Sequence, residues 1–145
     1  MRFRILWVGR TKERYLKEGI DRYLMLLGYM SPVSVTEIKE EKGKSREASL
    51  LTEGRRILKQ TQSYILLDER GKEFTSPEFA RFLEERGTVD FVLGGAYGVS
   101  GEVRERAEAV VALSKMTLTH EMARVILLEQ LYRAMTILKG REYHH

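Results

Sequence analysis

The regular alternation of short apolar runs with segments of helical periodicity constrains this chain most. Apolar runs typical of buried strands lie at residues 3–8, 33–38, 64–68, 89–93 and 110–113. Helical patterns are expected at 15–28, 45–61, from Ser76 onward, at 101–107 and at 121–138, with Ser45 and Ser76 as helix caps. Such an order predicts an α/β fold, a parallel sheet with helices on both faces. Residues 1–145 are expected to form a single domain.

Composition removes several classes of protein and of site. The 145 residues include no cysteine, which excludes disulfides, thiolate metal sites and a cysteine nucleophile. The histidines and acids lack the spacing of a metal motif, so no metal is expected. No apolar run reaches the ~18 residues of a membrane span, and the first nine residues are charged too early for a signal peptide. We therefore expect a cytoplasmic protein with no membrane partner.

Charge is divided unevenly along the chain. Residues 1–62 carry 14 Lys and Arg against 8 Asp and Glu, a net charge of +6, whereas residues 63–145 carry 11 against 13, a net charge of −2. A basic N-terminal half attracts a polyanion such as RNA. The same charges also suit a solvated basic surface that has no partner.

The last helical segment is apolar on more than one face. Its apolar residues are Met122, Ala123, Val125, Ile126, Leu127, Leu128, Leu131, Tyr132, Ala134, Met135, Ile137 and Leu138. One sheet cannot bury all of them, so the helix needs a second burial partner. The same helix of another subunit is the simplest one, which predicts a homodimer.

A glycine-rich turn follows the fourth predicted strand. Gly94, Gly95 and Gly98 allow unusual dihedrals and a close backbone approach to a ligand, although a tight turn without a ligand fits them as well. The spacing is not that of a dinucleotide-binding motif. Leu118 also stands where a ribose-binding acid is expected in such a motif.

Polar residues at both ends of the last helix are further candidates. His120, at its start, suits substrate orientation or proton exchange, and equally a capping or packing role. Glu129 and Arg133 are four residues apart, as in a surface ion pair or an enclosed polar site. The tail at 139–145 combines cations, a tyrosine and two histidines, which suit phosphate and base binding or a frayed end.

Four motifs carry a resemblance to a known family: LGGAYGVS at 93–100, LSKMTLTHEMARV at 113–125, EQLYRA at 129–134 and YH at 143–144. Over its whole length the chain resembles the bacterial large-subunit rRNA pseudouridine-N3 methyltransferases of the RlmH type, which belong to the SPOUT superfamily. The resemblance implies a parallel sheet flanked by helices, a C-terminal trefoil knot and an active homodimer. Connection rules alone would have discarded a knot.

The resemblance also implies a cofactor, a substrate and site residues. S-adenosylmethionine would be enclosed by Leu67, Gly94, Leu113, Ser114, Lys115, Met116, Thr117 and Leu118. The acceptor would be N3 of a pseudouridine in 23S rRNA, on the assembled 70S ribosome. The residues placed around that base are His120, Arg133, Tyr143 and His144.

Three of these four residues have an expected role. Arg133 would stabilise the developing anion, Tyr143 would stack or hydrogen bond, and His144 is a candidate proton acceptor. Arg124 and Glu129 are expected to support the site or the dimer.

Two alternatives stay open. One is a non-enzymatic RNA- or ribosome-binding protein of the same fold, and the other is a SPOUT methyltransferase for another RNA nucleotide. The sequence departs from the family pattern at Thr119, where proline is frequent, at Tyr97, where the position is variable or acidic, and at the terminal His145.

Overall fold

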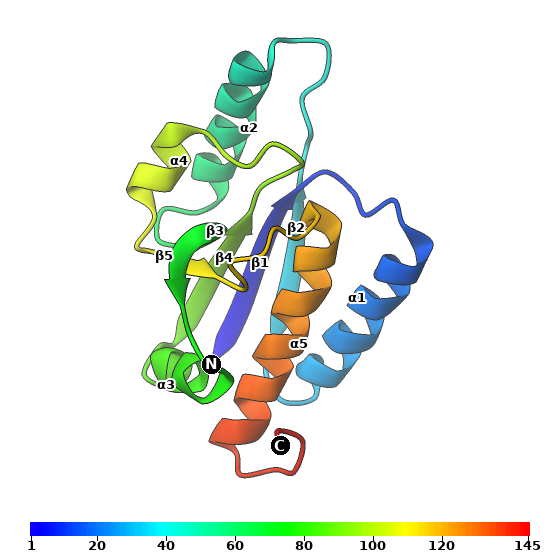
Figure 1. Cartoon of the computed structure of the whole chain (residues 1–145), viewed down its shortest axis with the longest axis vertical. Coiled ribbons are helices and arrows are strands. Elements are labelled where there is room, and N and C mark those ends of the chain that lie inside the picture. Colours follow the sequence, from blue (N-terminus) through cyan, green and yellow to red (C-terminus); the bar gives the residue numbers. More distant parts are fainter.

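The computed structural model describes all 145 residues and contains one sheet of five parallel strands (Figure 1). The strands are β1 (Arg2–Val8), β2 (Val33–Ile38), β3 (Ile65–Glu73), β4 (Thr88–Leu93) and β5 (Ala109–Ala112), in the order β2-β1-β4-β3-β5. The helices are α1 (Arg14–Gly28), α2 (Arg46–Gln60), α3 (Ser76–Glu84), α4 (Gly101–Arg106) and α5 (His120–Leu138). The predicted α/β alternation is confirmed.

Helices cover both faces of the sheet, as predicted. Alternate residues of β1 face opposite sides: Phe3 and Ile5 belong to the core shared with α1, α3 and α5, whereas Leu6 and Val8 belong to the core shared with α2 and α4 (Figure 1). Two apolar layers therefore cover this strand, which explains the unbroken apolar run at residues 5–8.

The third strand is longer than its sequence indicates. The prediction ended it at residue 68, but β3 runs to Glu73 and pairs with β5 a second time after a register break between Leu67 and Lys72. A Cβ at Gly71 would lie 2.6 Å from the carbonyl carbon of Val110, so only glycine lets the strand pass this close. The charged residues after position 67 hide the continuation, because they carry no apolar alternation.

One of the two predicted helix caps is confirmed and the other is not. Ser45 caps α2, and its hydroxyl accepts from the Ala48 amide at 3.2 Å. The prediction of Ser76 as the cap of α3 was wrong: Thr75 caps that helix and forms a reciprocal capping box with Glu78. Ser76 instead donates its hydroxyl to Gln130 Oε1 at 2.7 Å, which ties α3 to α5.

Part of the apolar surface of α5 is buried inside the chain. The helix lies on the sheet between α1 and α3, and eight of its residues are buried (Figure 1). Met122 and Ile126 are only half-buried, so some of their apolar surface remains for a second partner to cover. None of the helices combines the length and apolarity needed to cross a membrane. The trefoil knot stays a prediction of the family resemblance.

Candidate active site

A cavity of about 380 Å³ lies at the carboxyl edge of the sheet, where residues 67–70 of β3 meet the loops after β4 and β5. Parallel α/β sheets place their ligands at this edge. Seven of the eight predicted cofactor residues line the cavity: Leu67, Gly94, Leu113, Ser114, Met116, Thr117 and Leu118. Lys115 is the exception. Its side chain is 80% exposed and pairs with Glu73 at 3.6 Å.

Close backbone packing shapes one wall of the cavity. The Gly98 amide donates to the Gly95 carbonyl at 3.0 Å, and Gly98 has a φ of +82°. A Cβ at Gly94 would lie 2.4 Å from the Gly98 carbonyl oxygen, whereas a Cβ at Gly95 would meet Val8 at an ordinary 3.6 Å. Glycine is therefore required at position 94 and at the left-handed position 98, but not at position 95.

The loop between β5 and α5 forms the opposite wall. Ser114 Oγ accepts from the Met116 amide at 2.9 Å. Thr117 donates its hydroxyl to Glu69, which lies in the polar second half of β3. Leu113 and Leu118 give this wall an apolar surface. The loop thus encloses a flat apolar group between side chains and fixed backbone.

Sequence reasoning missed the charged pair in this cavity. Asp68 and Arg104 are 2.5 Å apart, and Arg70 lies 3.3 Å from the same carboxyl group. Burial opposes ionisation of Asp68, but hydrogen bonds from Arg104 and Arg70 outweigh it and lower its pKa. The position of Asp68 directly after an apolar run of β3 was the available signal. The pair offers both donors and an acceptor to the polar parts of a ligand.

His120 lines the same cavity from the first turn of α5. Burial, and secondly the charge of Arg124, lowers its pKa, so the imidazole is neutral near pH 7. Thr119 caps the helix, accepting from the Met122 amide at 3.3 Å. His120 itself is therefore not the cap, and its ring is available to the cavity.

Buried charges anchor this end of α5 to the loop after β1. Arg124 is fully buried and donates to the Val8 carbonyl at 2.7 Å and to the Thr11 hydroxyl at 2.9 Å. Glu121 accepts from the amides of Lys12 and Glu13 at 2.9 and 3.0 Å. The expected supporting role of Arg124 corresponds to this anchoring beside His120.

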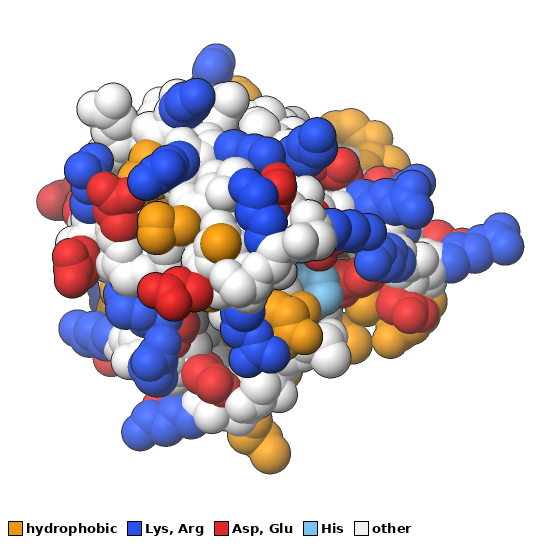
Figure 2. Space-filling model, turned by 90° about the horizontal axis from the view of Figure 1, so that it is seen from above, with side chains coloured by type: hydrophobic (Ala, Val, Ile, Leu, Met, Phe, Trp, Pro, Cys, Tyr) orange, Lys and Arg blue, Asp and Glu red, His pale blue; other side chains and the backbone are white.

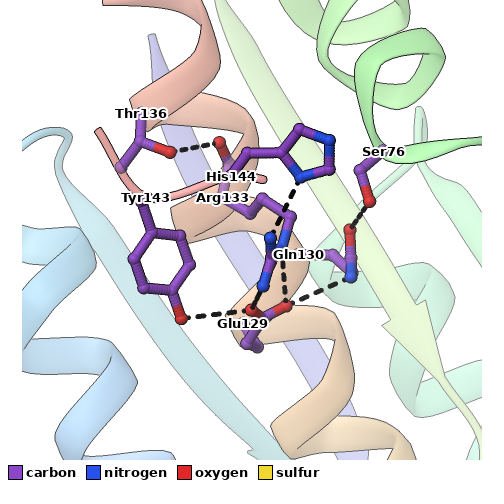
Figure 3. A network of polar contacts seen from close by, with 7 residues as sticks. All are labelled: Ser76, Glu129, Gln130, Arg133, Thr136, Tyr143 and His144. Atoms are coloured by element: carbon purple, nitrogen blue, oxygen red, sulfur yellow. Dashed lines mark hydrogen bonds and ion pairs between the residues drawn. The ribbon is translucent and has the colours of Figure 1, made fainter. Parts of the chain in front are cut away.

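A second polar cluster lies at the other end of α5 (Figure 3). Arg133 pairs with Glu129 at 2.6 Å and lies 3.0 Å from Nδ1 of His144. The Tyr143 hydroxyl donates to Glu129 Oε1 at 3.1 Å, and the Arg133 guanidinium lies 4.8 Å from the centre of the Tyr143 ring. The tail is folded back onto the helix in this way, with Gly140 in the left-handed conformation at the reversal.

Contacts within the cluster shift the pKa values of Arg133 and Tyr143. The hydrogen bond to Glu129 raises the pKa of Arg133. Burial, together with Tyr23 and Glu129, raises the pKa of Tyr143, which therefore stays a donor. Arginine has only donors, so in the contact between Arg133 and His144 the imidazole Nδ1 is the acceptor.

One chain does not bring all four predicted catalytic residues together. Arg133, Tyr143 and His144 are in contact, but His120 is 13 positions before Arg133 on the same helix. That separation corresponds to about 20 Å along the helix axis. The chain therefore carries a cavity with His120 and a separate cluster at the tail.

A sequence profile described as "Predicted SPOUT methyltransferase" matches residues 1–144. The chain belongs to the SPOUT methyltransferase family. Curated relatives named "Ribosomal RNA large subunit methyltransferase H" cover it almost end to end: the Geotalea daltonii protein is 46% identical over 100% of both chains, and the Thermodesulfovibrio yellowstonii protein is 43% identical over 99% of both.

Solved structures share the fold of this chain. A "Probable Methyltransferase" from Bordetella pertussis Tohama I has a TM-score of 0.56 at 14% identity, covering 92% of this chain and 96% of that one. TrmJ from Z. mobilis ZM4 has a TM-score of 0.53 at 13% identity, covering 92% of this chain and 70% of that one. At such identities the likeness concerns the fold alone. Within this SPOUT fold, the cavity and the tail cluster are the two sites to be explained.

Proposed function

We propose that this SPOUT chain is an enzyme that transfers a methyl group from S-adenosylmethionine to N3 of a pseudouridine in 23S rRNA of the large ribosomal subunit. Its substrate would be the assembled 70S ribosome in the cytoplasm. One observation carries the proposal: seven of the eight residues expected around the cofactor line one cavity, in a chain 43–46% identical to proteins named for rRNA methylation.

The cavity suits S-adenosylmethionine in shape and polarity. Leu67, Leu113 and Leu118 provide apolar contacts for adenine, and Gly94, packed directly against Gly98, presents bare backbone at the cavity wall. The Asp68–Arg104 pair offers partners to ribose hydroxyls and to the amino-acid group. A neutral His120 does not repel the cationic sulfonium. When bound, the cofactor supplies an activated methyl group with a good leaving group.

The tail cluster suits activation of the acceptor. N3 of the base must lose its proton, and the Arg133 guanidinium can stabilise the resulting anion. Nδ1 of His144 is occupied by Arg133 in this structure. Proton uptake at that nitrogen requires His144 to release Arg133, and the same movement would free Nη1 of Arg133 to face the anion while Glu129 still holds the rest of the guanidinium. Tyr143 would hold the base through its ring or its hydroxyl.

A homodimer would unite the two sites. Transfer requires donor and acceptor atoms within about 3–3.5 Å, and the roughly 20 Å along α5 prevents this within one chain. In the proposed dimer, the cavity of one protomer faces the tail cluster of its partner. The half-buried apolar residues of α5 fit such an interface.

Mixing two inactive variants tests this dimer. Gly94→Ala removes the cavity and Arg133→Ala removes the tail cluster, so each homodimer is inactive. Co-refolded heterodimers retain one intact site, and we expect about a quarter of the wild-type specific activity for random pairing. Activity no higher than that of the separate variants would refute the shared site.

Methylation of purified 70S ribosomes, followed by mapping of the modified base, tests the function itself. The ribosomes come from a strain that lacks the corresponding gene. A methyl group at N3 of one pseudouridine is the expected result, and a methyl group on another nucleotide would instead support a different SPOUT specificity. S-adenosylmethionine at 100 times its Kd should stabilise the fold by about 2.7 kcal/mol. No stabilisation and no methylation would leave a non-enzymatic RNA-binding protein.

A further inference from the structure

Tyr97 and Arg46 form an exposed stacked pair at the rim of the cavity. The Arg46 guanidinium lies 3.7 Å from the centre of the Tyr97 ring, and Tyr97 is 64% exposed. Tyr97 borders both the cofactor cavity and a neighbouring hollow of about 440 Å³ lined by residues of the 40–46 segment. The pair therefore stands between the expected position of the methyl donor and open solvent.

The backbone holds the tyrosine in place. Tyr97 lies at the tip of a turn that a bridge between Gly95 and Gly98 closes, and Gly94 packs directly against Gly98. The turn fixes the backbone beneath the ring, and the stack with Arg46 orients the ring itself, so less freedom is lost when a partner stacks on it. This suits a fixed platform for a flat group.

The charge of Arg46 stacks on Tyr97 but has no ion pair within the chain. Arg46 is the first residue of α2, where a cation opposes the helix dipole. The neighbouring Lys42 and Lys44 pair with Glu40 and Glu41 at 3.7 and 3.4 Å, whereas Arg46 has no carboxylate within 4.0 Å. A local electrostatic cost without a compensating acid points to a partner outside the chain.

We propose that Tyr97 and Arg46 bind an unpaired nucleotide of the rRNA beside the target base, with the ring stacking on the base and the guanidinium binding a phosphate. Unstacked bases in RNA loops are recognised by aromatic rings and arginine planes in this way. The face viewed in Figure 2 carries many Lys and Arg side chains with Asp and Glu side chains among them, and the cations suit the flanking phosphates. This inference rests on the proposed function, because it assumes rRNA as the substrate.

The test compares Tyr97→Ala, Tyr97→Phe and Arg46→Ala with the wild-type chain. KM for 70S ribosomes and the affinity for a fluorescein-labelled RNA single strand of about 12 nucleotides are measured. We expect Tyr97→Ala to raise KM and weaken RNA binding about tenfold, and Tyr97→Phe to restore both values. Arg46→Ala should reduce the salt slope of log Kd by about one. Tyr29→Ala is the matched control, because Tyr29 is 78% exposed at the end of α1.

Two outcomes would overturn the inference. One is a Tyr97→Ala chain with wild-type KM and wild-type RNA affinity. The other is a calorimetric loss of S-adenosylmethionine affinity that accounts for the whole loss of activity, since the ring would then act on the cofactor. A wild-type chain that binds RNA through Tyr97 but methylates no ribosome would leave the RNA contact standing and remove the proposed function instead.

Discussion

The two ends of α5 carry two differently built sites. At the amino end, the cavity is formed by glycine backbone, apolar side chains and the loop between β5 and α5. Its charged residues Asp68 and Arg104 are already paired with each other. At the carboxyl end, Glu129, Arg133, Tyr143 and His144 form a cluster held by side-chain hydrogen bonds on the surface (Figure 3). The first site selects a ligand by shape, and the second offers charge and protons. A substitution that adds volume should therefore damage the cavity, and a substitution that removes a charge should damage the tail cluster.

The strongest test of this contrast adds one methyl group to the cavity. In Gly94→Ala the new Cβ would lie 2.4 Å from the Gly98 carbonyl oxygen, so the turn must move. We expect S-adenosylmethionine binding to fall at least about 100-fold in calorimetry, because the backbone that shapes the cavity is displaced. Gly95→Ala is the matched control, since its Cβ meets only Val8 at 3.6 Å, and it should bind normally. Equal affinities of the two variants would remove the shape argument.

A second test removes one charge from the tail cluster. Arg133→Ala should lower the methylation rate at saturating substrate about 100-fold, since a donor to the developing anion is lost. Its affinity for S-adenosylmethionine should stay at the wild-type value, because Arg133 does not line the cavity. Arg141→Ala is the control: Arg141 is an exposed tail cation without an ion pair. If both variants lose the same activity, general tail charge rather than the cluster is responsible.

The sequence predicted the fold well because its signals are local. Apolar runs such as that of β4 and caps such as Ser45 lie within a few residues of the structure they determine. The extension of β3 was missed because pairing with β5 stabilises it, and such pairing leaves no periodicity in the strand itself. Thr75 was missed as a cap because Ser76 and Thr75 are both good capping residues, and only the reciprocal bond to Glu78 separates them.

The site was predictable only where motifs mark it. Apart from Arg104, the cavity residues lie in three segments, 67–70, 93–99 and 113–123, and the family motifs cover the last two. Asp68 and Arg104 are 36 residues apart and form a pair only after folding, which no spacing rule reveals. Likewise, the motifs name His120 and Arg133 together, yet their positions on one helix keep them apart. A sequence assigns residues to a site, whereas helix geometry decides whether one chain can assemble it.

The smallest expected effect concerns His120, the titratable ring in the site built by shape. Burial, followed by Arg124, lowers its pKa below the 6.5 of the unfolded chain. As pH falls through about 6.5, the unfolded state therefore takes up the proton first, and the fold loses stability that it holds at higher pH. Urea unfolding at pH 8 and pH 5.5 should show a larger loss for the wild type than for His120→Asn, with a difference below about 1 kcal/mol. If the His120→Asn chain loses as much unfolding free energy as the wild type, or more, burial does not lower the pKa of His120. The amino end of α5 would then be open to solvent.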